Sequence, residues 1–210
     1  MTIIMDQIAN QAAKIHYMSG GKLKVPMVVR TNLGASRRSA AQHSQSLHVW
    51  LGHIPGLKVI LPSTPYDAKG LMKTAIRDDN PVVFFEDKMM FQDKGNVAEG
   101  DDTIPFGVAD IKKEGTDITL IGTSSMVQVA LEAADHLAQI GISAEVIDPR
   151  TILPLDKKTL IDSAIKTSRA IVIDEGYASY GVTAEIASII AKTYVSSVDS
   201  GSGSDYIVTS

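Results

Sequence analysis

The sequence predicts an α/β protein with two successive domains, each built on a parallel β-sheet covered by helices on both faces. Short runs of β-branched and apolar residues recur along the chain and are typical of strands buried on both faces. Segments with apolar residues at helical spacing alternate with these runs. Such alternation favours parallel strands joined by helical crossovers.

Six runs are expected to form strands, namely residues 25–29, 58–61, 81–85, 118–121, 144–147 and 170–173. Five segments are expected to form helices, namely residues 6–17, 65–77, 127–137, 160–165 and 184–192. The helix at 65–77 has the clearest start. Thr64 suits the N-cap, Pro65 fits the first helical position, and Asp67 completes a capping box. Gly141 is placed to end the helix at 127–137.

The segment 92–105 interrupts the alternation with glycine, aspartate and proline and has little apolar content, so it predicts an interdomain linker. The first domain is therefore expected to span residues 1–91. The second, with three strand–helix units, is expected to span residues 106–195. Residues 196–210 are rich in serine and glycine and are predicted to form a disordered tail, because such a composition buries too little surface to offset its ordering entropy.

Composition excludes several classes of function. The net charge of -4 argues against a nucleic-acid partner, and no apolar run approaches the roughly 20 residues that cross a bilayer. The first residues carry neither a charged leader nor a long apolar stretch, so no secretory signal is predicted. The chain has no cysteine, which rules out disulfides and thiolate metal sites and fits a cytoplasmic location.

His43 is the first candidate for a catalytic side chain. It lies in the run Gln42-His43-Ser44-Gln45, where amides and a hydroxyl can hold the ring and its tautomer. An imidazole has an ordinary pKa near 6.5 and can give or take a proton near neutral pH. The alternative is a surface or N-cap histidine without a catalytic role. His48 and His53 follow at five-residue steps, which do not share a helical face, so no zinc site is predicted and both are expected to be structural or solvent-facing.

Other charged residues mark strand ends. Glu86 follows an expected strand, where open α/β sheets place ligand-binding residues, although a salt bridge with Lys88 is an equal alternative. The turn Asp78-Asp79-Asn80 is explained by turn chemistry, and its carbonyls could also ligate a cation. Asp148 and Arg150 end another strand and are expected to pair across a domain or subunit interface.

The sequence around these residues resembles that of the beta subunits of the thiamine-diphosphate-dependent 2-oxo acid dehydrogenases, in the transketolase-like superfamily. The resemblance covers residues 5–194. Its motifs are Asp6-Gln7-Ile8-Ala9-Asn10, Gln42-His43-Ser44-Gln45, Pro55-Gly56-Leu57-Lys58-Val59, Asp67-Ala68-Lys69-Gly70-Leu71, Ala75-Ile76-Arg77-Asp78, Asn80-Pro81-Val82, Asp148-Pro149-Arg150-Thr151 and Asp174-Glu175-Gly176. The run Ser46-Leu47-His48 is most similar to the acetoin dehydrogenase branch.

The resemblance implies a transketolase-like pyrimidine-binding domain followed by a transketolase C-terminal-type domain. It places His43 beside the reactive carbon of the cofactor, where it assists protonation of the substrate or the lipoyl group. It also implies that main-chain carbonyls of Met27, Ala75, Asp78 and Asn80 hold a potassium ion in some members. The implied partners are an alpha subunit, which supplies the diphosphate and magnesium site, a second beta subunit, and a lipoyl-bearing acyltransferase core.

The sequence departs from the family pattern at its start. The glutamate that protonates the aminopyrimidine ring in the family lies upstream of the segment matched by residues 6–14, and Glu86 does not stand in for it. The pyrimidine-binding domain is therefore expected to be incomplete and the chain to be a truncated subunit. One hypothesis is a working enzyme subunit. Alternatives are a catalytically silent fragment that keeps only assembly surfaces, and an unrelated small-molecule-binding α/β domain.

Overall fold

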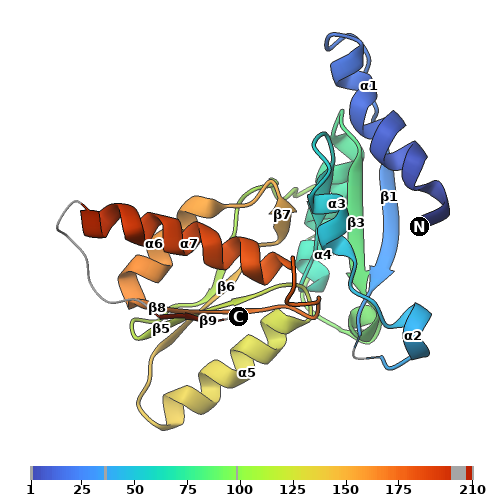
Figure 1. The fold of residues 1–210 in the computed structure, drawn as a ribbon. Coiled ribbons are helices and arrows are strands. Elements are labelled where there is room, and N and C mark those ends of the chain that lie inside the picture. Colours follow the sequence, from blue (N-terminus) through green and yellow to red (C-terminus); the bar gives the residue numbers. More distant parts are fainter. Residues whose placement is uncertain (1, 36, 98, 200–206, 210) are drawn as a thin grey trace. The chain divides into compact units, whose positions relative to one another are not determined.

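The computed structural model describes residues 2–35, 37–97, 99–199 and 207–209 (Figure 1). The chain divides into two compact units. The first unit comprises Met1–Gly107 together with Thr151–Pro154, and the second comprises Val108–Arg150 together with Leu155–Ser210. Each unit has its own sheet and its own hydrophobic core.

The sheet of the first unit has the strand order β1-β3-β2-β7. Strands β1 (Val28–Leu33), β3 (Val82–Asp87) and β2 (Lys58–Ile60) run parallel, and β7 (Thr151–Leu153) joins β2 in the antiparallel direction. Residues of β1 and β3 pair in an unbroken register from Val28–Val82 to Leu33–Asp87. Both strands therefore begin and end at the same edges of the sheet.

Helices cover both faces of this sheet. The first unit contains η1 (Thr2–Ile4), the π-helical turn η2 (Gln7–Ala12), α1 (Ala13–Met18), α2 (Ala40–His43), α3 (His48–Gly52), α4 (Pro65–Arg77) and η3 (Lys88–Gln92). Val83 and Phe85 pack with Ile8 and Leu51 from η2 and α3. Val82 and Phe84 pack on the other face against Leu71 of α4 and its neighbours. The alternation of sides along β3 is the two-residue period of a strand.

The predicted helix at 65–77 is confirmed as α4, with the expected start. The Thr64 hydroxyl accepts a hydrogen bond from the Asp67 amide at 3.1 Å, and Pro65 occupies the first turn. The segment 92–105, predicted as a linker, lies in the first unit and packs on this helix. Ile104 is buried there because α4 carries Gly70, where a Cβ atom would stand 2.6 Å from the Ile104 side chain.

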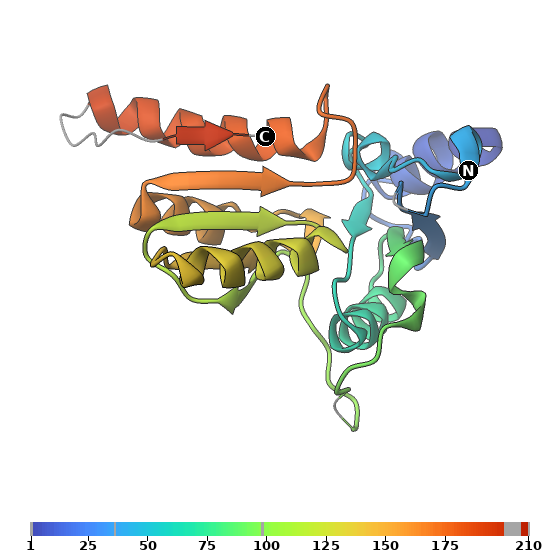
Figure 2. The ribbon, with the colours of Figure 1, turned by 90° about the horizontal axis from the view of Figure 1, so that it is seen from below.

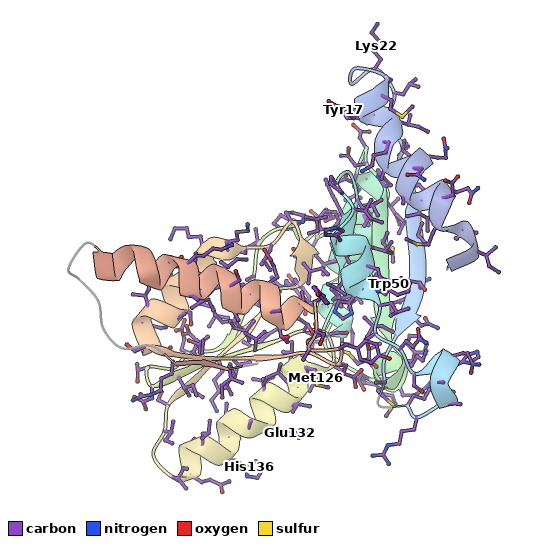
Figure 3. All side chains as sticks on the ribbon, viewed as in Figure 1. Tyr17, Lys22, Trp50, Met126, Glu132 and His136 are labelled. Carbon is purple, nitrogen blue, oxygen red and sulfur yellow. The ribbon has the colours of Figure 1, made fainter. Side chains whose placement is uncertain are left out.

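The sheet of the second unit has the strand order β4-β6-β5-β8-β9. Strands β6 (Ala144–Asp148), β5 (Ile118–Gly122), β8 (Arg169–Ile173) and β9 (Ile207–Thr209) are parallel, and β4 (Asp110–Lys113) pairs with β6 in the antiparallel direction. Helix α5 (Met126–Gln139) covers one face, and α6 (Lys157–Thr167) and α7 (Val182–Asp199) cover the other (Figures 1 and 2). Glu132 and His136 lie on the solvent side of α5 (Figure 3).

The predicted fold class is confirmed, with a few local differences. The strand expected at 25–29 begins at Val28, because Pro26 has no amide to donate to a ladder. The antiparallel strands β4 and β7 were not predicted, since each is only three or four residues long. Most of the predicted tail lies outside the described residues. Of residues 196–210, the structure describes 196–199 as the end of α7 and Ile207–Thr209 as β9.

None of the described helices combines the length and apolar content needed to cross a membrane.

Candidate active site

His43 ends α2, a single four-residue turn at the carboxyl ends of β1 and β3 (Figure 1). Its side chain is exposed, and within the described residues the ring makes no hydrogen bond. Parallel α/β sheets place ligand-binding groups at this edge because the loops that follow their strands meet there. The imidazole is therefore presented to whatever docks at the carboxyl end of the sheet.

The segment around His43 is held by hydrogen bonds rather than by apolar packing. The Ser39 amide donates to the Ser44 hydroxyl at 2.7 Å, and the Gln45 side-chain amide donates to the Ala41 carbonyl at 3.1 Å. The backbone is left-handed at Arg38 and Ala40, with φ of 55° and 61°. A non-glycine residue in that region costs on the order of 1–3 kcal/mol, and such strain gathers at functional sites.

Two residues that follow this segment in the sequence, Ser46 and His48, are buried. His48 is buried, and its ring meets Phe85 edge-on at a centroid distance of 6.2 Å. The Ser46 hydroxyl is also buried and has no hydrogen-bond partner in the described part of the chain. His53 is exposed, as expected for a residue outside the core. Within the described residues no group of three or more histidine, aspartate or glutamate side chains could hold a metal ion.

Glu86 pairs with Arg30 and not with Lys88, so the predicted salt-bridge partner was wrong. Arg30 donates to both carboxylate oxygens, at 2.8 Å to each from Nη2 and at 3.0 Å to one from Nε. Lys88 points elsewhere and donates to the main-chain carbonyl of His43. The contact between Lys88 and the His43 segment links residues 45 positions apart, and no local pattern in the sequence signals it.

The four candidate cation ligands lie together at the opposite end of the same sheet. Met27 precedes β1, Asp78 and Asn80 precede β3, and Ala75 is in the last turn of α4. The Met27 carbonyl accepts from the Val82 amide at 2.9 Å, and the Ala75 carbonyl accepts from the Asp78 amide at 3.3 Å. A carbonyl oxygen has two lone pairs, so each retains one for a cation. The partial negative charge at a helix C-terminus also suits a cation.

The Asp78 carboxylate organises this turn. It accepts hydrogen bonds from the Asn80 amide at 2.8 Å and from the Asn80 side chain at 3.0 Å, and it forms an ion pair with Lys58. Lys58 also lies 5.6 Å from the centre of the Phe106 ring. Burial raises the pKa of the Asp78 carboxyl, but hydrogen bonds from Lys58 and Asn80 outweigh burial and hold that pKa below the ordinary aspartate value.

The structure therefore separates the predicted site residues into two groups. His43 is at the carboxyl edge of the sheet, and the carbonyls are at its amino edge. Strands of this length span roughly 17–20 Å. The carbonyl cluster is thus suited to fixing the sheet rather than to contacting a group at His43.

The charged strand end in the second unit makes local contacts, and pairing across a subunit interface stays a prediction. Arg150 donates to Asp110 at 2.9 Å, and its amide donates to Asp148 at 2.7 Å. After β8, Asp174 accepts from the Gly176 amide at 2.7 Å and from the Thr123 hydroxyl. All of these contacts lie within the second unit.

Each of the two units matches a known protein family. The pattern "Transketolase, pyrimidine binding domain" matches residues 4–94, and "Transketolase, C-terminal domain" matches residues 107–202. Among solved structures, the chain is similar to one titled "Split gene transketolase, inactive beta4 tetramer". The TM-score is 0.70 at 21% identity, over 90% of this chain and 61% of that one. At this identity the likeness supports the fold alone.

Two curated relatives are much closer in sequence. The beta subunit of the acetoin:2,6-dichlorophenolindophenol oxidoreductase of Bacillus subtilis is 52% identical over 89% of this chain and 54% of its own length. The beta subunit of the pyruvate dehydrogenase E1 component of Rickettsia conorii is 50% identical over 89% of this chain and 57% of its own length. The chain thus spans about half the length of these relatives. On the two domain matches and these identities, the chain belongs to the transketolase-like family, in the group of the beta subunits of acetoin and 2-oxo acid dehydrogenases.

Proposed function

We propose that this chain serves as the beta subunit of the thiamine-dependent first component of an acetoin or 2-oxo acid dehydrogenase complex, with His43 as its proton-transfer group. The observation that carries the proposal is the exposed imidazole at the carboxyl edge of a pyrimidine-binding-type sheet. An imidazole there can protonate a substrate oxygen or an acyl-accepting sulfur, a contribution typically worth about 10²–10⁴ in rate.

The family depends on thiamine diphosphate, and the described residues fit one part of that cofactor but not another. His43, exposed and held on a turn, suits the end where the substrate reacts. The buried Ser46 hydroxyl leaves a further unsatisfied polar group behind that turn. The pyrimidine ring needs a carboxyl group beside it, and Glu86 does not supply one because both its oxygens are engaged by Arg30. The functional role proposed for this chain is therefore proton transfer and assembly.

Potassium fits the second group of residues. Two carbonyls of the turn, those of Asp78 and Asn80, receive no amide among the described loop hydrogen bonds, and those of Met27 and Ala75 keep a free lone pair. Hard cations prefer oxygen ligands, and main-chain carbonyls are among them. We place the ion there as a structural element of the amino edge of the sheet.

The proposed partners are an alpha subunit of the same component, a second beta subunit and a lipoyl-bearing acyltransferase core. The named relatives are subunits, and a subunit completes its site with another chain. The surface that would meet the alpha subunit includes the His43 turn, because the cofactor is shared between subunits in such enzymes.

The test compares two exposed histidines of the first unit. Wild type, His43→Ala and His53→Ala are each combined with an alpha subunit of this class. Thiamine diphosphate binding is measured by calorimetry, and substrate turnover by 2,6-dichlorophenolindophenol reduction, with acetoin and pyruvate in separate arms. Transfer to lipoamide is followed as well. His43→Ala is expected to lower transfer by about 10²-fold or more with little change in cofactor affinity, while His53→Ala stays within about twofold.

Equal effects of the two substitutions would refute the role of His43. If His43→Ala instead weakened cofactor binding as much as turnover, the residue would be a binding group rather than a proton donor. A wild-type complex that forms but shows no turnover with either substrate would support the catalytically silent alternative.

A further inference from the structure

Lys88 donates to the main chain of the candidate active site, as Lys14 does to the Pro55 carbonyl elsewhere in the first unit. Lys88 is the first residue of η3, directly after β3, and its side chain is half-buried. Its ammonium group donates to the main-chain carbonyl of His43. Lys58, Lys113 and Lys166 each pair with a carboxylate. Within the described residues Lys88 has no such partner, so its charge is directed at the backbone of the candidate active site.

The His43 carbonyl needs a donor from outside its own turn. The last carbonyls of any helix lack an intrahelical partner, and in the four-residue α2 nearly all of them are of this kind. A lysine ammonium is a favourable donor at a helix C-terminus, because it satisfies the carbonyl and complements the partial negative charge of that end. Lys88 supplies this donor at the residue whose side chain is proposed to transfer the proton.

The other described hydrogen bonds of this segment are local. Ser39 bonds to Ser44, and Gln45 bonds to Ala41, so both close the loop on itself. These bonds shape the segment but leave its orientation to the sheet undetermined. The bond from Lys88 connects the end of β3 to the segment and so ties the segment to the sheet.

Lys88 is itself firmly placed. It follows β3, the strand that pairs with β1 on one side and with β2 on the other. The buried Asp87 carboxylate caps η3 by accepting from the Met89 amide at 2.8 Å. The close approach of Gly34 to Asp87, where a Cβ atom would stand 3.0 Å from Oδ1, packs the end of β1 against the same carboxylate. The base of Lys88 is therefore part of the rigid sheet.

We propose that Lys88 is a positioning residue that holds the His43 turn in register with the carboxyl edge of the sheet. The inference rests on the proposed function, since positioning matters only if His43 acts. It predicts that loss of the ammonium group loosens residues 39–45 and lowers proton transfer through His43, without altering the core of the first unit.

The first arm of the test needs no cofactor or activity. Peptide-resolved hydrogen exchange is measured on wild type, Lys88→Met, Lys88→Arg and Lys22→Met. Lys22 is an exposed lysine at the end of the first unit remote from α2, and serves as the matched control (Figure 3). Lys88→Met is expected to speed exchange in residues 39–45 by about tenfold, with β3 and α4 unchanged. Lys88→Arg, which keeps a cationic donor, and Lys22→Met are expected to match wild type.

The second arm is a double-mutant cycle in the complex with an alpha subunit. Lys88→Met is expected to lower kcat for transfer to lipoamide about tenfold, with KM within about twofold, because a small misplacement of a catalytic group carries a cost of this kind. In the His43→Ala background, Lys88→Met is expected to cause no further loss. A residue acting only on general stability would add its effect in both backgrounds.

The positioning role of Lys88 and the proposed function of the chain would be contradicted by different results. Unchanged exchange in residues 39–45, or faster exchange across the whole first unit, would overturn the positioning role. Additive losses in the cycle would overturn it as well. If His43→Ala itself has no effect on transfer, the proposed function fails, and the exchange arm still decides whether Lys88 holds the turn.

Discussion

Lys166 on α6 forms an ion pair with Glu145 on β6, whose side chain is completely buried in the second unit. The Ser163 hydroxyl donates to the same carboxylate, and Ser163 in turn bonds with the Thr119 hydroxyl at 2.7 Å. A buried charge without a partner is strongly destabilising. The interactions with Lys166 and Ser163 therefore offset the cost of burying the Glu145 carboxylate in the core.

Removal of this cation is expected to destabilise the second unit. Breaking a fully buried pair costs about 3–5 kcal/mol, and Lys166 is 41% exposed, so solvent screening reduces the expected loss for Lys166→Met to about 1–3 kcal/mol. Urea unfolding measures it. Lys158→Met on the same helix removes only an exposed pair with Asp162 and is the control, expected to leave the unfolding midpoint unchanged.

The pH dependence of the stability lost in Lys166→Met follows from the ionisation of Glu145. Burial raises the pKa of its carboxyl, but hydrogen bonds from Lys166 and Ser163 outweigh burial and hold that pKa below the ordinary glutamate value. The stabilisation is therefore fully present at pH values above the ordinary glutamate pKa. It is lost as pH falls through the lowered pKa of Glu145. The difference between wild type and Lys166→Met should shrink below about pH 4.3. A difference that grows on acidification would contradict this assignment.

Asp78 is expected to give the first unit a similar acid sensitivity. Its lowered pKa means that its contribution is present above about pH 3.9 and disappears as pH falls further. Asp78→Asn keeps the shape of the side chain but loses the ion pair with Lys58, and should cost about 1–2 kcal/mol at pH 7. Denaturation followed at pH 7 and pH 3 tests this, because the variant and the wild type should converge at the lower pH.

Potassium is expected to stabilise the same turn. A ligand that binds only the folded state stabilises that state by RT ln(1 + L/Kd), where L is the free ligand concentration, and so raises the unfolding temperature. Thermal unfolding in potassium chloride is compared with unfolding in choline chloride at equal ionic strength. A higher midpoint in potassium, reduced in Asp78→Asn, is the expected outcome, whereas identical midpoints in both salts would remove the ion from this site.

Gly56 is expected to be intolerant of any side chain. Its φ is +101°, and a Cβ atom there would stand 2.0 Å from the Ala13 carbonyl oxygen. Backbone strain and a clash with main-chain atoms together predict a loss of about 2–4 kcal/mol for Gly56→Ala. Gly20 is the matched control, since its φ of +64° is also left-handed but no atom lies within 4 Å of its added Cβ. Gly20→Ala should cost only about 1 kcal/mol in the same unfolding assay.

The sequence predicted well those features that depend on local pattern. Helix α4 was expected between the same residues that the structure shows, because Thr64, Pro65 and Asp67 specify its start. The buried strands around Val83 and Ile121 were found from their apolar runs. The polar run Gln42-His43-Ser44-Gln45 singled out His43 as a candidate, and the resemblance to a family gave it a role.

Features that depend on contacts distant in the sequence were missed. Nothing near Glu86 reveals that Arg30, on the neighbouring strand, is its partner rather than Lys88. The bond from Lys88 to the His43 carbonyl joins two loops that only the parallel register of β1 and β3 brings together. Strands such as β7 are too short to carry a periodic signal, and their pairing depends on the completed sheet.

The separation of the carbonyl cluster from the imidazole along the same strands has a practical consequence. Met27 and Asn80 lie at the amino edge of the sheet and His43 lies beyond the opposite edge. With the roles proposed above, stability and proton transfer would depend on different sets of positions. Substitutions at the amino edge are then expected to change stability while leaving the proton-transfer residue untouched.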